Sequence, residues 1–315
     1  MTDMHPARRV TLQRHILESQ RRHPETIGEL SVILTQLAYA GKIFAHALGR
    51  APLAGLLGAT GGTNVQGEGT KKLDVFGNET IAGAFASLGL VSAIVSEEDD
   101  EPRQIACGPG AKYILCIDPP SGDGTREAKV AGLRSGRDQV AAGYLMYGPS
   151  TAFVYTTGEG LHGFTLDAGI GEFILSHPAL RCPDAGSYYS ANLANVPTWP
   201  AKARAYIEQL TATRAVDQAH SLRYAGALVA DLHRTLIEGG IYLYPCDRRH
   251  PDGKLRLLYE CAPLAFVVEQ AGGVASTGAT RVLDVPIESI HQRVPFAAGS
   301  RHEVARFDAH MRGDP

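Results

Sequence analysis

The sequence has 315 residues, of which 44% are hydrophobic and 20% are charged, and its formal net charge is -3. A chain of this length and composition can bury one large core or two ordinary ones, which argues against disorder. The charge balance leaves no basic excess to bind a nucleic-acid backbone or an anionic membrane. The five cysteines form no CxxC pair, so neither a disulfide framework nor a zinc site is predicted.

The sequence shows no targeting segment and no membrane span. Residues 1–9 carry charge but are not followed by an apolar stretch of the kind that a signal peptide needs. The apolar segment 30–48 contains Gln36, Lys42 and His46, which is typical of a buried helix rather than of a transmembrane helix. We therefore expect a soluble, cytoplasmic protein.

The first elements along the chain are predicted to be helices. Apolar residues recur at helical spacing from residue 12 to about residue 22, and Pro24 ends that pattern. A second helix is predicted from about residue 30 to residue 49. Segment 53–64 is rich in glycine, which indicates a loop whose backbone adopts unusual angles or approaches a ligand.

Short apolar runs then predict strands, with helices between the later ones. The predicted strands are 90–95, 113–117, 152–156 and 255–259. His, Pro, Asp and Gly cluster at 176–187, which predicts a boundary between an N-terminal domain of residues 1–178 and a C-terminal domain of residues 179–315. The mixture of helices and strands indicates an α/β protein.

Three of the predicted strands are followed by acidic residues. Segment 90–95 runs into the acids 97–101, segment 113–117 into Asp118, and segment 255–259 into Glu260. Clustered carboxylates at the ends of buried strands repel one another unless a cation neutralises them, and ligands made only of oxygen favour Mg²⁺ or Mn²⁺ over zinc. The pattern predicts a metal site, although a solvated acidic loop at 97–101 is an open alternative.

Basic residues precede one of these acids. Strand alternation would place Lys254, Arg256 and Glu260 on one face, so that anion-binding cations and a metal ligand share a surface. Pro263 is a plausible first helical residue, and this puts Glu260 at a junction between a strand and a helix. A plain surface strand would also tolerate the two cations.

Many segments together resemble the class I fructose-1,6-bisphosphatase family in order and spacing. They are 62–68 (GTNVQGE), 71–75 (KKLDV), 96–99 (SEED), 140–144 (VAAGY), 147–150 (YGPS), 162–166 (HGFTL), 186–190 (GSYYS), 222–224 (LRY), 233–235 (HRT) and 253–260 (GKLRLLYE). The resemblance implies a sugar-phosphatase fold with alternating helix and sheet layers, and a homotetramer. It also implies hydrolysis of fructose 1,6-bisphosphate to fructose 6-phosphate and phosphate by a multi-metal, in-line attack of water.

The resemblance also implies roles for individual residues. The implied ligands of Mg²⁺, or alternatively of Mn²⁺, are Glu97, Glu98, Asp118 and Glu260. The implied contacts to the sugar and its 6-phosphate are Asn192, Tyr224, Tyr244, Lys254 and Arg256, with Arg223 reaching in from a neighbouring subunit. Asp74 and Glu98 would activate water, and the loop around Glu68 would close over the site. Glu68 stands where the family commonly has Asp, so its arm is longer.

A second site is suggested near the amino terminus. The residues Gly28, Glu29, Leu30 and Ser31 open a helix, and the unpaired amides of a helix start can bind an anion. In the family this turn, with a Lys-Tyr pair that matches Lys112 and Tyr113, binds the inhibitor AMP. An ordinary helix start is the alternative.

The largest departure from the family follows Pro119. The family continues with Leu-Asp-Gly-Ser-Ser-Asn and a strand, whereas here segment 120–125 (PSGDGT) follows at once, a gap of roughly twenty residues. Asp123 is a candidate substitute ligand within this loop. The gap predicts reduced activity and an unusually high Mg²⁺ requirement. It leaves two alternatives open, namely an impaired paralogue that binds AMP or phosphosugars, and a sedoheptulose-1,7-bisphosphatase.

Overall fold

The computed structural model describes residues 9–23, 28–63, 69–105, 111–118, 134–211 and 220–313. The chain divides into two compact units that are not continuous in sequence. The first unit comprises residues 1–128, 145–154 and 163–178, and the second comprises residues 129–144, 155–162 and 179–315. The chain therefore passes between the units several times, and the last of these passages falls between Pro178 and Ala179.

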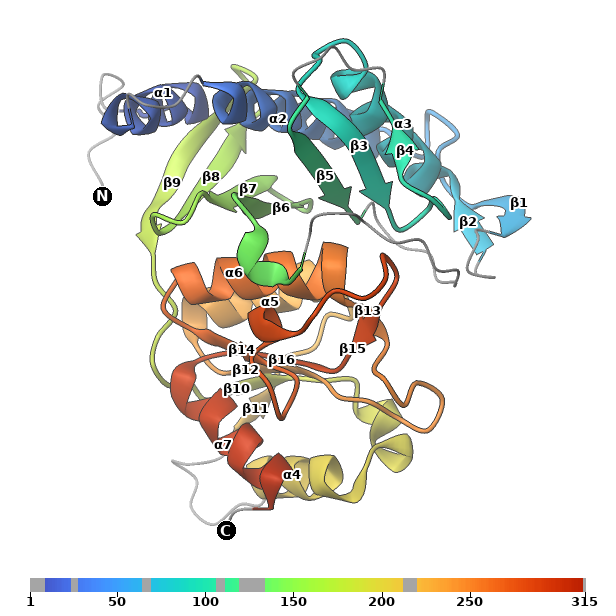
Figure 1. The fold of residues 1–315 in the computed structure, drawn as a ribbon, viewed down its shortest axis with the longest axis vertical. Coiled ribbons are helices and arrows are strands. Elements are labelled where there is room, and N and C mark those ends of the chain that lie inside the picture. The colour runs from blue at the N-terminus through green and yellow to red at the C-terminus, as the bar shows by residue number, and fades with distance from the viewer. Residues whose placement is uncertain are drawn as a thin grey trace. The chain divides into compact units, whose positions relative to one another are not determined.

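Most elements up to residue 180 belong to the first unit (Figure 1). Its helices are α1 (Leu12–Arg22), α2 (Glu29–Leu48) and α3 (Lys72–Phe85). The strands are β1 (Ala59–Thr63), β2 (Gly69–Lys71), β3 (Val91–Ser96), β4 (Arg103–Gln104), β5 (Tyr113–Ile117), β6 (Ala142–Met146), β7 (Ala152–Thr156), β8 (Leu161–Asp167) and β9 (Glu172–Leu180). β6 to β9 form a four-stranded sheet in sequence order, and the division between the units falls within each of its four strands.

The sheet that matters most for function in the first unit has the order β4-β3-β5. β3 and β5 run parallel, with Ser96 opposite Ile117 at their carboxyl ends. α2 and α3 pack against these strands through a buried cluster to which Ile33, Phe85 and Ile94 contribute. The apolar runs that predicted a helix at 30–49 and strands at 90–95 and 113–117 are thus confirmed by elements that share one core.

The second unit contains the remaining elements. Its helices are α4 (Ala201–Thr211), α5 (Leu228–Glu238), α6 (Ala262–Gln270) and α7 (Arg301–Arg312), with the short helices η2 (Gly136–Asp138), η3 (Leu193–Thr198), η5 (Leu257–Cys261) and η6 (Val282–Asp284). The strands are β10 (Tyr188–Ser190), β11 (Ser221–Leu222), β12 (Ile241–Tyr244), β13 (Leu255–Arg256), β14 (Val274–Ser276), β15 (Arg293–Val294) and β16 (Phe296–Gly299).

A five-stranded mixed sheet of order β11-β10-β12-β16-β14 forms the centre of this unit. Figure 1 shows α5 and α6 on one side of it and α4 and α7 on the other, so this unit has the layered α/β arrangement that the sequence predicts. β10 and β12 lie close together because β12 is preceded by Gly240, which has φ of 109°. A Cβ at this position would lie 2.0 Å from the carbonyl oxygen of Tyr188, so only glycine fits.

One predicted strand is largely wrong. Segment 255–259 is extended only at Leu255 and Arg256, after which η5 makes one wide helical turn that leads into α6. The reason is the lack of a partner, since β13 pairs only with the two-residue strand β15. The N–H of Leu257 still donates to the carbonyl oxygen of Gln292 at 2.7 Å, and beyond it the turn closes through a hydrogen bond from the N–H of Ala262 to the carbonyl oxygen of Leu257. Glu260 therefore lies in a helical turn and not at the end of a strand.

None of the helices in the described parts of the chain is long and apolar enough to cross a membrane.

Candidate active site

Two of the predicted acidic segments meet at one edge of the first unit. Glu97 follows β3 directly and Asp118 follows β5 directly, and these strands are parallel neighbours. The backbone N–H of Glu97 donates to the carbonyl oxygen of Ile117 at 3.3 Å, which joins the two strand ends. Glu97 is buried and Asp118 is exposed. The expectation that these two strands deliver their acids to the same place is confirmed.

Asp74 provides a third carboxylate near this edge. It lies in the first turn of α3, is only 1% exposed, and accepts a hydrogen bond at Oδ2 from the backbone N–H of Lys71 at 2.9 Å. Burial raises the pKa of Asp74, and the negative charge of Glu97 adds to that effect. Its Oδ1 atom is buried and has no hydrogen-bond partner among the described residues. This oxygen is available to accept a proton or to face a cation.

The acidic turn after β3 is tied to α3 by residues that the motif analysis missed. Asn78 donates from Nδ2 to Oδ1 of Asp99 at 3.3 Å, and the guanidinium of Arg103 makes ion pairs with Asp99 and with Glu79 of α3. Asn78 follows Asp74 by one helical turn, a spacing that places both on one face of α3. That spacing is the sequence signal that would have identified Asn78.

Within the parts of the chain that the structure describes, no three acidic, histidine or cysteine side chains come close enough together to hold a metal ion. Glu68 and Asp123, which the sequence analysis assigned to this region, lie outside the described residues. The structure thus brings together Asp74, Glu97 and the end of β5, and it does not complete a ligand set by itself.

The second unit brings together most of the predicted sugar-binding residues. The pKa of Tyr224 is raised by burial of its hydroxyl and by the nearby acidic groups of Tyr244 and Asp231, while Lys254 and a hydrogen bond with the Asn192 side chain act in the opposite direction. Tyr244, Asp231 and Lys254 therefore act electrostatically on the Tyr224 hydroxyl, and the Asn192 side chain lies within hydrogen-bonding reach of it. Asn192 itself caps the start of η3, where its side chain accepts a hydrogen bond from the backbone N–H of Ala194 at 3.2 Å.

Arg256 and Glu260 form a buried pair beside β13. The backbone N–H of Arg256 donates to Oε2 of Glu260 at 2.6 Å, and Nη1 of the guanidinium lies 3.8 Å from the same oxygen. Their side chains are 4% and 7% exposed. The two residues are neighbours, as predicted, but through the i,i+4 relation of a helical turn and not through strand alternation.

Arg223 lies at the surface, unlike Arg256. Its guanidinium stacks over the ring of Tyr188, 5.1 Å from the ring centre, and Nη1 donates to the carbonyl oxygen of Leu222 at 2.9 Å. Stacking on an aromatic ring holds a guanidinium in a defined orientation while its remaining donors stay available.

The residues of the suggested anion site near the amino terminus also lie together. α2 begins after Gly28, which has φ of 77°, and Nζ of Lys112 pairs with the carboxylate of Glu29 at 3.3 Å. The Oγ of Ser31 donates to Oε1 of Gln20 at 3.0 Å. Thus the helix start and Lys112 are neighbours in the fold, and Tyr113 follows as the first residue of β5.

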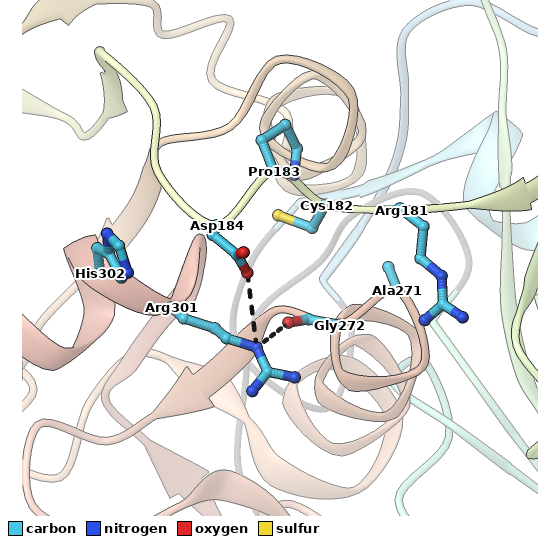
Figure 2. Close-up of a pocket in the computed structure, with 8 residues that line it drawn as sticks. All are labelled: Arg181, Cys182, Pro183, Asp184, Ala271, Gly272, Arg301 and His302. Atoms are coloured by element: carbon cyan, nitrogen blue, oxygen red, sulfur yellow. Dashed lines mark hydrogen bonds and ion pairs between the residues drawn. The ribbon is translucent and has the colours of Figure 1, made fainter.

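A shallow cavity of about 600 Å³ in the second unit contains none of the predicted site residues. Figure 2 shows Arg301 of α7 pointing to the end of α6, where its Nε donates to the carbonyl oxygen of Gly272 at 2.5 Å and lies 3.9 Å from Oδ1 of Asp184. The basic charge of Arg301 is therefore already used to satisfy the end of α6 and to offset Asp184. We assign no function to this cavity.

The geometry agrees with comparisons to known proteins. The family model described as "Fructose-1-6-bisphosphatase, N-terminal domain" matches residues 10–132 and 123–178, and the one described as "Fructose-1-6-bisphosphatase, C-terminal domain" matches residues 182–312. The chain belongs to the fructose-1,6-bisphosphatase family. Its activity is hydrolysis of fructose 1,6-bisphosphate, and the chain is thus a phosphatase of carbohydrate metabolism and gluconeogenesis.

Individual relatives cover nearly the whole chain. A class 1 fructose-1,6-bisphosphatase of Acaryochloris marina is 46% identical over 92% of this chain and 94% of its own length. A cytosolic fructose-1,6-bisphosphatase of Arabidopsis thaliana is 41% identical over 98% of this chain and 96% of its own length. The solved structure of Leishmania major fructose-1,6-bisphosphatase in holo form superposes with a TM-score of 0.88 and is 34% identical in sequence. The superposition covers 97% of this chain and 99% of that chain. These similarities favour fructose-1,6-bisphosphatase over the two alternatives that the sequence left open.

The alignments also bear on the gap after Pro119. The alignment with the Arabidopsis relative spans 327 positions, more than the 315 residues of this chain, so the relative has residues without a counterpart here. Residues 123–132 belong to both matched segments of the N-terminal family model. The alignment length does not locate the missing residues, whereas the overlap of the two matched segments falls near the predicted gap; residues 119–133 lie outside the described part of the structure.

Proposed function

We propose that this fructose-1,6-bisphosphatase binds Mg²⁺, or Mn²⁺ in its place, through Glu97, Glu98 and Asp118. The observation that carries the proposal is the meeting of two strand ends with acidic residues beside a buried Asp74 whose pKa is raised in part by Glu97. Such a set of like charges and oxygen ligands fits a hard divalent cation. The sequence resemblance adds Glu260 to this set.

The residues of this edge would then act on water. When bound, Mg²⁺ supplies Lewis-acid stabilisation of the charge that develops during phosphoryl transfer. Asp74 is suited to accept the proton of the attacking water, because its Oδ1 has no other partner among the described residues and its raised pKa favours proton uptake. Glu98 would orient the water, and the family resemblance adds Glu68 to the catalytic residues. The products are fructose 6-phosphate and inorganic phosphate.

In the second unit, we propose that the fructose 6-phosphate part of the substrate is bound by Asn192, Tyr224, Tyr244, Lys254 and Arg256. The electrostatic coupling of Tyr224 to three of these residues supports the assignment. Lys254 and Arg256 offset the charge of the 6-phosphate, and Tyr224 and Tyr244 donate hydroxyl hydrogen bonds. In a homotetramer, Arg223 would bind the same phosphate in a neighbouring subunit.

The direct test is release of phosphate from fructose 1,6-bisphosphate with and without Mg²⁺, on protein whose intact mass matches the sequence. We expect turnover that disappears on chelation and returns with Mg²⁺ or Mn²⁺. Turnover that is unaffected by chelators would contradict the metal assignment and leave the family assignment intact.

The gap after Pro119 leads to a quantitative expectation. A two-metal site needs enough carboxylates to hold two cations against their repulsion, so loss of one strand-end aspartate weakens the binding of the second ion. We expect the chain to need an unusually high Mg²⁺ concentration for its half-maximal rate. Insertion of Leu-Asp-Gly-Ser-Ser-Asn and the following strand between residues 119 and 120 should lower that concentration and raise the rate. If the unaltered chain works at ordinary Mg²⁺ concentrations, the gap is compensated and Asp123 is the first residue to test.

We further propose AMP as an inhibitor that binds at the start of α2. The support is the position of Lys112 beside Glu29 and the amides that follow Gly28. Calorimetry should detect AMP binding that Lys112→Ala weakens while binding of fructose 6-phosphate persists. Lys42→Ala is the matched control, because Lys42 is also an ion-paired lysine of the first unit, with Glu172 at 3.0 Å. No binding at millimolar AMP would identify an ordinary helix start.

A further inference from the structure

The loop that carries Arg223 and Tyr224 is held by its backbone in an unusual way. Residues 221–227 are exposed, and the adjoining strand β11 has only two residues. Nevertheless the N–H of Arg223 donates to the carbonyl oxygen of Tyr189 at 2.9 Å, and the N–H groups of Ala225 and Gly226 donate to the carboxylate of Asp231 at 2.9 to 3.1 Å. The loop is therefore fixed on both sides of Tyr224 without a hydrophobic core of its own.

Asp231 belongs to α5 and is fully buried. Its charge is offset by Arg234, whose Nη2 donates to Oδ1 of Asp231 at 2.8 Å. The same nitrogen donates to the carbonyl oxygen of Arg223 at 2.6 Å. One ion pair on α5 thus contacts three peptide groups of the loop, at residues 223, 225 and 226.

These contacts determine where two neighbouring side chains point. The ring of Tyr224 lies over Gly226, because a Cβ at that glycine would be 3.7 Å from Cε1 of the ring. The backbone N–H and carbonyl oxygen of Arg223 are fixed by Tyr189 and Arg234, and the stacking of its guanidinium on Tyr188 depends on this backbone position. A shift of the loop would therefore move both side chains together.

We propose that Asp231 and Arg234 are positioning residues that set the affinity of the enzyme for the distal phosphate of its substrate. The inference rests on the proposed assignment of Arg223 and Tyr224 to the fructose 6-phosphate moiety. A buried ion pair often adds little to stability compared with apolar residues of the same size, whereas it can specify one conformation. Here the conformation it specifies is that of a ligand-binding loop, and neither residue takes part in bond breaking.

The experiment compares two substrates and two pairs of residues. In Asp231→Asn and in Arg234→Met we expect the KM for fructose 1,6-bisphosphate to rise roughly ten- to a hundredfold with kcat nearly unchanged, since misplaced binding groups lose ground-state and transition-state binding alike. The kcat/KM for fructose 1-phosphate, which has no distal phosphate, should stay at the wild-type value. Calorimetry should show the same loss for fructose 6-phosphate without any turnover.

The chain offers a matched control and a rescue. Asp284 and Arg281 form an ion pair with the same spacing in the same unit, at 3.3 Å, with side chains 34% and 41% exposed. Asp284→Asn and Arg281→Met should leave the kinetics with both substrates unaffected. Arg234→Lys keeps one charged donor and should recover part of the affinity, because a single nitrogen makes both bonds of Arg234.

Three results would overturn the inference. Equal losses with both substrates, affinities that do not change, or variants at both positions that fail to fold would show that the pair serves only the fold. Failure of the underlying assignment looks different, since Arg223→Ala and Tyr224→Ala would then also leave the affinity for fructose 6-phosphate unchanged.

Discussion

The buried pair of Arg256 and Glu260 allows a prediction whose size follows from the structure. The guanidinium Nη1 lies 3.8 Å from Oε2 of Glu260, and both side chains are almost fully buried. Two unit charges at this separation attract by about 4 kcal/mol at an effective dielectric constant of about 20. This value is an upper bound for the pair, because both residues take part in other interactions as well.

The perturbation is a double-mutant cycle of Glu260→Gln and Arg256→Met, measured by urea unfolding with the metal removed by a chelator. Each single change removes one charge of this buried ion pair and should cost about 3 to 5 kcal/mol. The side chain of Gln keeps an oxygen that can accept a hydrogen bond from the N–H of Arg256. The stability lost in Glu260→Gln therefore reflects mainly the loss of the negative charge. The free energy of unfolding of the double variant should exceed the value expected from adding the two single changes by about 2 to 3 kcal/mol.

A matched control comes from α1. Arg14 and Glu18 have the same i,i+4 spacing at 2.7 Å, but their side chains are 60% and 43% exposed. The coupling energy of this exposed pair should be about 0.3 to 0.5 kcal/mol. If the coupling of Arg256 and Glu260 is no larger than that of the control, the assignment of a strong buried pair is refuted. Full phosphatase activity in either single variant would refute their proposed roles in the site.

Three further predictions concern catalysis, assembly and pH. Glu98→Gln removes a charge at nearly constant shape, so turnover should almost vanish while the circular dichroism spectrum is unchanged; normal turnover would remove Glu98 from the site. Mixtures of Arg223→Ala chains with Glu98→Gln chains should regain activity if Arg223 completes a neighbouring subunit, and no recovery at any ratio would place its action within its own chain. Burial raises the pKa of Asp308, although a hydrogen bond with Ser276 opposes the shift, so the folded state prefers the protonated acid and loses stability as pH rises through that pKa. Asp308→Asn should therefore stabilise the protein more at pH 7 than at pH 4 in urea unfolding, and an equal effect at both values would contradict this reasoning.

The sequence by itself determined the elements whose patterns are local. Helices α1 and α2 and strands β3, β5 and β7 lie within one or two residues of their predicted bounds, because their apolar spacing reflects burial in a core. The acids that follow β3 and β5 were placed correctly for the same reason, since the carboxyl ends of two parallel neighbours meet at one edge of the sheet. The fructose-1,6-bisphosphatase motifs also indicated the family, because each motif is a short run of neighbouring residues.

Tertiary structure alone decided the features that depend on a partner distant in sequence. Segment 257–261 has the apolar composition of a strand but forms the helical turn η5, because β13 pairs with only two residues of β15. The link from Asn78 to Asp99 joins a helix to a turn that only packing brings together. The hydrogen bonds from Asp231 and Arg234 to the loop of Arg223 could not be predicted from the sequence either. They join side chains to backbone groups, and backbone groups are the same at almost every residue.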